Sequence, residues 1–343
     1  MHALALGLTV KGAATWFPPR VETAATAIAN GTALPEDVEA SGVSEVRVSG
    51  PVSAPEMATL AASIALEAAD VKPDAVTFLA YAHLFHQGLE LWSPGHYVAN
   101  QVGMTLALPT TISQGCDGAA VGILHAANYL RTQSESGLAM VVASDSFENA
   151  PFSRWQCQPA LVLGDAASAA VLCNRPAQTG EITLASLSFI TDPSLEILNR
   201  GELGFARNYS EHQTNLSRIR QATDSALVNY GRKRLTNLAR EKSHAAIQAA
   251  LREAHAQPEE ISLLMLPRIG RATVESVYAP VYECLPKARQ IESGAVTGHL
   301  ACGDWLADIS DITETNLLDS GQKALVVLAG GGFTWAAAVI ERK

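Results

Sequence analysis

Cys116 is the residue of this sequence whose setting is best suited to chemistry. It lies in the stretch TISQGCDGAAVGILHAANYL, residues 111–130, where Gly115 marks a turn and the apolar spacing predicts a helix that begins at the cysteine. Unpaired N–H groups and the helix dipole stabilise a thiolate at a helix N-terminus, which makes such a thiol a nucleophile. The alternative is a small buried apolar residue, the usual role of a free cysteine. We assign that role to the other four cysteines: Cys157, Cys173, Cys284 and Cys302.

His299 is the second residue with suitable chemistry. It lies in VTGHLACGDWLADISDI, where Gly298 precedes it as Gly115 precedes Cys116, at an offset of 299 − 116 = 183 residues. An imidazole beside the thiol could take its proton and later activate an acceptor hydroxyl. The alternative is a histidine that caps the following helix.

Asp304, five residues after His299, could complete this set. A carboxylate on the far imidazole nitrogen would fix the tautomer and stabilise the imidazolium. A solvent-facing aspartate is the alternative, and Asp308 and Asp311 are nearby competitors for the same role.

An internal repeat predicts how these turns are brought together. Residues 61–81 and 246–266 both read as an alanine-rich helix, a turn with proline and an apolar strand, with 258 − 73 = 185 residues between the two prolines. The strand-like runs LAMVVAS and KALVVLA, which put Ala139 opposite Ala324, share this offset. Alternating helices and strands predict an α/β fold built from two similar halves, residues 1–175 and 176–343. A pseudo-two-fold axis would then place the turns of Cys116 and His299 face to face.

Composition excludes several other classes. The chain has 343 residues, 48% of them hydrophobic and 17% charged, which is typical of a soluble globular protein. Its net charge of −10 disfavours nucleic-acid binding, and no apolar run is long enough for a membrane helix. Five scattered cysteines without a CxxC pair predict neither disulfides nor a zinc site, which fits the cytoplasm. His83 and His86 lack a third ligand nearby, so we expect no metal site.

Two further segments complete the expected site. The tail LAGGGFTWAAAVIERK has three glycines after a buried strand, and their N–H groups could form an oxyanion hole with the N–H of Cys116. A glycine-rich β-turn is the alternative. The stretch from Gln178 to about Arg240 does not repeat cleanly, and we expect it to run over the surface.

These features together resemble β-ketoacyl carrier-protein synthase III of the thiolase superfamily. The resemblance spans nearly the whole chain and rests on the Cys116 turn, LVLGDAASAAVL at 161–172 and GGGFTW at 330–335. It implies a thiolase-like five-layered αβαβα fold, a homodimer, a phosphopantetheine tunnel to Cys116 and Gly331 as the second oxyanion donor. It implies no cofactor, because the acyl donor is a coenzyme A or carrier-protein thioester.

The sequence departs from this family at two positions. The condensing enzymes use a histidine in an HQAN stretch and an asparagine in a GN stretch to decarboxylate malonyl thioesters. Here Arg268 and His299 occupy those positions. Arginine cannot act as a neutral base, so the decarboxylating pair is missing. The remaining Cys–His–Asp set resembles the ketosynthase III-like acyltransferases of polyketide pathways.

Three hypotheses follow. The leading one is acyl transfer through Cys116 to a hydroxyl on a polyketide or its sugar, or to a carrier protein in starter loading. Decarboxylative condensation is the second and a catalytically silent partner subunit the third. For an anionic donor, the expected contacts in this acidic chain are basic residues, although the 232–234 run could equally be an ordinary solvated surface. They are Arg232, Lys233, Arg234, Arg268 and Arg271.

Overall fold

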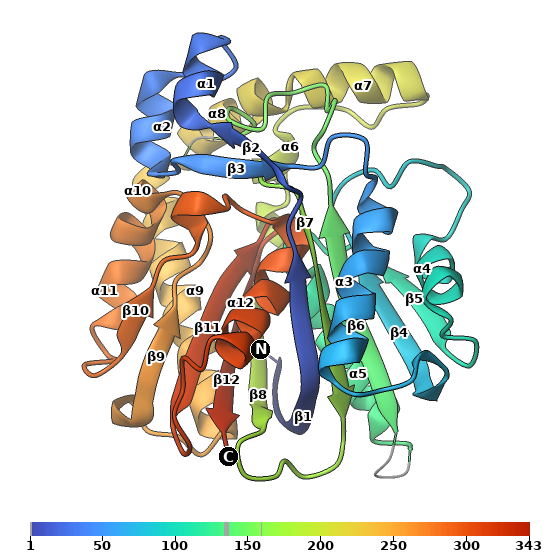
Figure 1. The fold of residues 1–343 in the computed structure, drawn as a ribbon. Helices are drawn as coiled ribbons and strands as arrows, with labels where there is room; N and C mark the ends of the chain where they lie inside the picture. Colours follow the sequence, from blue (N-terminus) through green and yellow to red (C-terminus); the bar gives the residue numbers. More distant parts are fainter. Residues whose placement is uncertain (1, 134–136, 159) are drawn as a thin grey trace.

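The structure is a computed structural model that describes residues 2–133, 137–158 and 160–343. The described residues form one 10-stranded sheet, covered by helices, and a separate 2-stranded sheet (Figure 1). In spatial order the large sheet holds β10 (Arg289–Ile291), β9 (Ile261–Met265), β11 (Lys323–Gly330), β12 (Thr334–Arg342), β8 (Ile182–Thr191), β1 (His2–Trp16), β7 (Ala166–Cys173), β6 (Leu138–Asp145), β4 (Val76–Ala82) and β5 (Leu108–Ile112). The small sheet pairs β2 (Arg20–Thr23) with β3 (Glu45–Val48).

The strand order of the large sheet repeats from each edge to the centre. It reads β5-β4-β6-β7-β1 from one edge and β10-β9-β11-β12-β8 from the other. Phe78 of β4 lies opposite Ala139 of β6, and Leu263 of β9 lies opposite Ala324 of β11, both in parallel pairs. Since 263 − 78 and 324 − 139 both equal 185, even the register follows the offset seen in the sequence. The division between residues 175 and 176 falls between β7 and β8 and stays a prediction.

The helices make this an α/β fold of five layers. Between the two halves of the sheet lie α5 (Gly118–Leu130) and α12 (Asp304–Glu314), which share one core with both halves. On the outer faces, α3 (Ala54–Ala68) packs against the first half and α9 (Arg232–Glu253) against the second. The expected thiolase-like αβαβα arrangement is confirmed.

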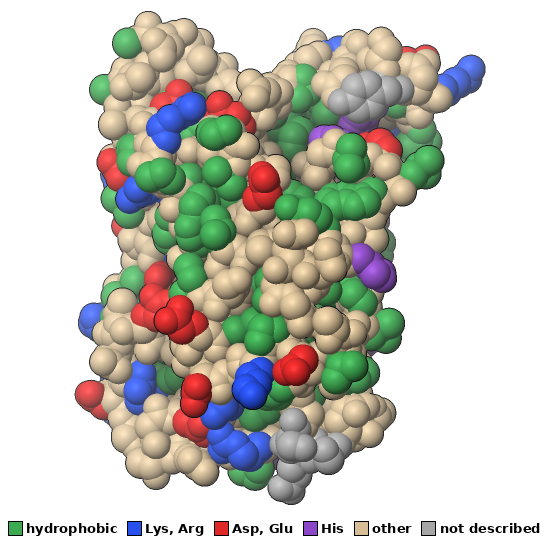
Figure 2. Space-filling model, turned by 45° about the vertical axis from the view of Figure 1, so that its right-hand side comes forward, with side chains coloured by type: hydrophobic (Ala, Val, Ile, Leu, Met, Phe, Trp, Pro, Cys, Tyr) green, Lys and Arg blue, Asp and Glu red, His purple; other side chains and the backbone are tan. Residues whose placement is uncertain are grey.

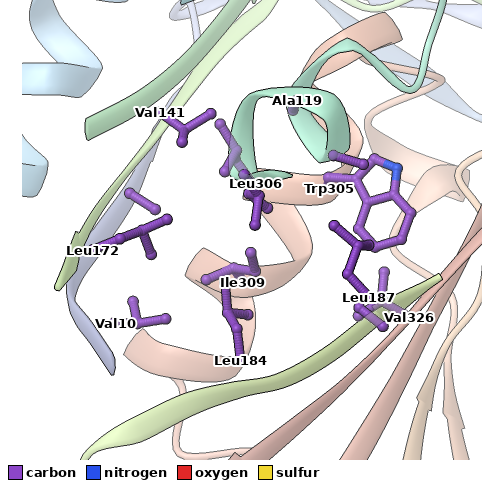
Figure 3. Close-up of a cluster of buried hydrophobic side chains, with 14 of the residues drawn as sticks. Val10, Ala119, Val141, Leu172, Leu184, Leu187, Trp305, Leu306, Ile309 and Val326 are labelled. Atoms are coloured by element: carbon purple, nitrogen blue, oxygen red, sulfur yellow. The ribbon is translucent and has the colours of Figure 1, made fainter. Parts of the chain in front are cut away.

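The central core is organised around α12, whose helix supplies Asp304. Trp305, Leu306 and Ile309 are at most 1% exposed and pack among side chains from both halves of the sheet (Figure 3). Burying one such side chain contributes about 1.5–3 kcal/mol. The helix that carries part of the site is therefore fixed by the centre of the hydrophobic core.

The expectation for residues 178–240 was wrong in part. Residues 182–191 form β8, a buried central strand, and only the chain after it runs over the surface. The two serines Ser186 and Ser188 obscure this strand in the sequence. Each donates a 2.7 Å hydrogen bond to a carbonyl of α9, on Ala250 and Ala246, so their burial is compensated.

The remaining helices cover the ends and edges of the sheet. They are α1 (Ala24–Ala29), α2 (Pro35–Ser41), α4 (Pro94–Val102), α6 (Ile197–Arg200), α7 (Tyr209–Ser217), α8 (Ile219–Tyr230), α10 (Arg271–Thr273) and α11 (Ala279–Tyr282). Among the described residues, no helix is both long and apolar enough to cross a membrane.

Candidate active site

Cys116 lies in a tight turn between β5 and α5. Gly115 has φ +55°, a left-handed conformation that favours glycine, and a Cβ there would lie 3.1 Å from the carbonyl oxygen of Gly331. The helix begins at Gly118, two residues later than the sequence predicted, with Asp117 as its N-cap. The half-buried Cys116 thiol therefore stands just before the helix N-terminus.

His299 is held by the LVLGD stretch, residues 161–165, which leads into β7. The backbone N–H of His299 donates to the carbonyl of Val162 at 2.8 Å, and the N–H of Gly164 donates to the carbonyl of His299 at 3.0 Å. A Cβ on Gly164 would overlap the carbonyl oxygen of Thr297, so only glycine permits this close approach. The family-like stretch thus positions the turn that bears the histidine.

The three predicted catalytic side chains form one hydrogen-bonded chain. The Nε2 atom of His299 lies 3.0 Å from the Sγ atom of Cys116, and its Nδ1 atom lies 2.6 Å from Oδ2 of Asp304. The other Asp304 oxygen accepts the N–H of Leu300 at 2.8 Å. His299 and Asp304 are each 2% exposed, so the interactions are shielded from water.

The electrostatics of this chain favour a charged imidazole. Burial by itself lowers the pKa of His299, but the Asp304 carboxylate and the Cys116 thiolate outweigh it, and the pKa is raised well above its usual range. A positive charge next to a sulfur atom favours nucleophilic attack by that sulfur. This is the arrangement of an activated cysteine nucleophile.

Arg268 decides between the three aspartates of α12. It donates to Asp308 at 3.1 Å and to Asp311 at 2.7 Å, while Asp304 alone contacts His299. The sequence interpretation of Arg268 as a donor contact is contradicted, because its side chain is only 1% exposed and is committed to these ion pairs. The Arg268 guanidinium is enclosed by protein, and a buried cation without such carboxylate partners would destabilise the fold.

The glycine loop after β11 lies against the Cys116 turn. The N–H of Gly330 donates to Oδ2 of Asp117 at 2.9 Å, and the Trp305 indole donates to its other oxygen at 3.3 Å. Burial raises the pKa of Asp117 to about 7. The sequence reasoning did not single out Asp117, although its position directly after the nucleophile was the available signal. It joins the turn of Cys116 to the loop that bears Gly331.

A second thiol supports the same turn. The Sγ of Cys302 donates to the carbonyl oxygen of Gly115 at 2.9 Å, and burial raises its pKa well above the usual range. A thiol held protonated in this way is not a nucleophile at neutral pH. The structural role expected for Cys302 agrees with this geometry.

The remaining basic residues predicted to contact the donor lie at the surface. Arg232 is exposed and pairs with Asp224 at 3.7 Å, while the Arg234 guanidinium lies 4.5 Å from the Tyr230 ring centre. Arg271, at the start of α10, is also exposed and lies beside Gly42. Their contact with the donor stays a prediction.

Comparison with known proteins agrees with this fold. Residues 251–342 match the family of the 3-oxoacyl-[acyl-carrier-protein (ACP)] synthase III C-terminal region. The structure of ChlB3, described as an acyltransferase, is similar over 98% of this chain and 97% of that one, with 26% identity and a TM-score of 0.86. The chain therefore has the fold of the ketosynthase III-like proteins of the thiolase superfamily, and its C-terminal part matches their family model.

Other structures share this fold with the chain at lower identity. One is 3-oxoacyl-[acyl-carrier-protein] synthase III from Aquifex aeolicus VF5, 19% identical over 97% of this chain and 99% of that one, with a TM-score of 0.76. Another is AbyA1, a tetronic acid condensing enzyme, 18% identical over 97% and 99%, with a TM-score of 0.75. No curated protein matches the sequence.

Proposed function

We propose that this ketosynthase III-like enzyme transfers an acyl group from a coenzyme A or carrier-protein thioester, through a thioester on Cys116, to a hydroxyl on a polyketide or its sugar. The transfer proceeds without decarboxylation. The observation that carries the proposal is the hydrogen-bonded chain from Cys116 through His299 to Asp304.

The first half-reaction loads the enzyme. The Cys116 thiolate attacks the carbonyl carbon of the donor thioester, and the N–H groups of Cys116 and Gly331 receive the developing oxyanion. The C–S bond to the donor breaks, and the departing thiolate takes the proton from the His299 imidazolium. The products are the free donor thiol, neutral His299 and the acyl group on Cys116.

The second half-reaction uses the same histidine as a base. Once the sulfur is acylated it carries no negative charge, so one of the causes that raise the pKa of His299 is gone. Neutral Nε2 then takes the proton of the acceptor hydroxyl as its oxygen attacks the acyl carbon. Collapse releases the ester and restores the Cys116 thiolate and the imidazolium.

Arg268 argues against decarboxylation. The resemblance places the first enolate-stabilising histidine of the condensing enzymes at this position. Here a buried guanidinium is bound by Asp308 and Asp311. It cannot change its protonation state at accessible pH and has no access to a substrate.

A single-turnover assay tests the proposal. The protein is exposed to a panel of acyl thioesters that includes malonyl thioester, and intact-protein mass spectrometry follows the mass added to Cys116. Carbon dioxide and ester are measured separately. We expect an acyl adduct and ester without carbon dioxide. Stoichiometric carbon dioxide with a new carbon–carbon bond would show condensation instead, and no adduct with any thioester would favour a silent subunit.

Binding of the acyl donor is tested with the basic residues at the start of α9. A phosphate-bearing donor would be attracted by Arg232 and Arg234, with Arg271 as a further candidate. Reversing Arg232 and Arg234 to Glu should raise the donor KM and weaken its dependence on salt, with kcat unchanged. An unaltered KM and salt dependence would remove these residues from the proposal.

We place the enzyme in the reducing cytoplasm, since its five cysteines are free.

A further inference from the structure

A cavity of about 1100 Å³ lies between α6 and α8, in the surface segment that follows β8. One wall is formed by residues from the 197–204 segment and the other by residues from 215–230. None of these residues belongs to the Cys116–His299–Asp304 chain. The segment lies outside the two stretches that repeat at the 185-residue offset, so it is an addition to the duplicated fold.

The α6 wall of the cavity contacts the expected active site, and the α8 wall is anchored to the first half of the chain. On the α6 side, a Cβ on Gly331 would overlap the side-chain amide of Asn199, so this helix packs against the expected oxyanion loop. On the α8 side, Arg220 donates to Asp37 at 3.0 Å and to the carbonyl of Gln156 at 3.2 Å. The α6 side of the cavity therefore lies next to the loop that bears Gly331.

The α8 wall presents uncharged hydrogen-bonding groups. Gln221, Ser225 and Asn229 are spaced four residues apart and share one face of the helix, along roughly 12 Å. Amides and hydroxyls both donate and accept, which suits ligands with several hydroxyl groups. Apolar side chains from both walls complete the lining: Ile197, Leu198, Leu203 and Val228.

The charges of the lining residues indicate whether the cavity suits the acyl acceptor or the phosphate-bearing acyl donor. Arg218 is the single cation among the lining residues, and Glu202 and Asp224 are the anions. Asp224 is already paired with Arg220 at 3.0 Å and Arg232 at 3.7 Å. Coenzyme A and phosphopantetheine carry phosphate and call for a cluster of cations. A nearly balanced wall favours a neutral ligand.

We propose that this cavity binds the acyl acceptor as a glycoside. Its hydroxyl-bearing sugar lies along Gln221, Ser225 and Asn229, and its apolar aglycone lies against Ile197, Leu203 and Val228. The inference rests on the proposed function and adds to it the place and the chemical class of the acceptor.

Binding measurements test the site without catalysis. Cys116→Ala protein is titrated by calorimetry with p-nitrophenyl β-glucoside, p-nitrophenyl α-rhamnoside and coenzyme A. We expect an aryl glycoside to bind, and a Gln221→Leu/Asn229→Leu variant to bind it about tenfold more weakly, because two hydrogen bonds are lost. The matched control is Gln213→Leu on the neighbouring helix α7, which does not line the cavity and should leave the affinity unchanged.

Three results would overturn the site: no binding of either glycoside, equal affinity in the double variant, or displacement of the glycoside by coenzyme A. The failure of the proposed function looks different. If the glycoside binds but no thioester acylates wild-type Cys116, the transfer proposal is wrong and the site stands. If Cys116 is acylated but no glycoside binds, the transfer proposal stands and this site is wrong.

Discussion

At the residue scale, the nucleophile can be separated from the thiol next to it. Cys116→Ala should abolish acyl-enzyme formation and turnover while folding survives, and Cys116→Ser should retain a trace because a serine beside a histidine base can attack a thioester. The measurement is intact-protein mass spectrometry after incubation with the thioester panel. Cys302→Ala is the matched control, since it removes the other thiol at the same turn and should still be acylated. Substantial turnover by Cys116→Ala would make the nucleophile assignment wrong.

Also at the residue scale, the imidazolium sets the pH range of acylation. A raised pKa means that His299 keeps its proton until the pH rises through that value, so the positive charge beside the sulfur is present below it and lost above it. In the wild-type protein, alkylation of Cys116 by iodoacetamide should therefore proceed at neutral pH. His299→Ala should move this reaction to alkaline pH and slow both half-reactions by about 10²–10⁴-fold. An unchanged pH profile would contradict this role of His299.

Asp304 gives a prediction of its own. Asp304→Asn should lower kcat by on the order of 10⁴-fold, because an amide facing Nδ1 favours the wrong tautomer. Asp311→Asn is the control, since this residue lies on the same helix and contacts Arg268 in place of His299. The variants are compared by single-turnover rates for acylation and deacylation. Similar losses in both variants would point to helix packing as the cause.

Sequence reasoning could predict the pairing of Cys116 with His299 because the internal offset relates two glycine turns. It could not choose Asp304 over its neighbours, since that choice depends on which carboxylates reach a buried arginine 40 residues upstream of Asp308. Arg268 itself reads as a surface cation in a linear sequence. Its burial follows from packing that brings β9 and α12 together.

At the scale of elements, Arg268 stabilises α12, the helix that carries Asp304, through ion pairs with two other aspartates of that helix. Arg268→Met leaves Asp308 and Asp311 without their cation, and breaking a buried pair in this way costs about 3–5 kcal/mol. Denaturant unfolding should show this loss. Arg268→Met/Asp308→Asn should recover part of it by removing one buried carboxylate. Neither variant should release carbon dioxide from malonyl thioester, and carbon dioxide release would overturn the reading of this position as structural.

Helices and strands could be predicted where their buried residues are also hydrophobic, so that the pattern is visible in the sequence. The helix–turn–strand units of α3–β4 and α9–β9 follow directly from the repeated stretches. Strand β8 was missed because its buried serines read as polar. The start of α5 was placed two residues early because the apolar pattern does not show that Cys116 and Asp117 still belong to the turn before the helix.

At the scale of the whole molecule, the sheet ends in an unprotected edge. β5 is the last strand in the order, so one side of it offers unpaired N–H and C=O groups. Large exposed apolar side chains lie on and before this strand: Leu89, Leu91, Leu106 and Leu108. Hydrophobic side chains gather in several groups on the face turned forward in Figure 2. An edge with exposed leucines is suited to pairing with a second copy.

We therefore predict a homodimer that pairs through β5. The wild-type protein should run near 2 × 36.2 = 72.4 kDa in sedimentation-velocity ultracentrifugation. Leu108 is 60% exposed, so Leu108→Glu should leave the monomer folded but place two like charges at the paired edge and shift the mass toward 36.2 kDa. Phe205→Glu is the control, because Phe205 is 89% exposed on the surface segment away from β5 and should leave the dimer intact. A monomeric wild-type protein would contradict the dimer. A dimer that survives Leu108→Glu and dissociates with Phe205→Glu would place the interface on the surface segment.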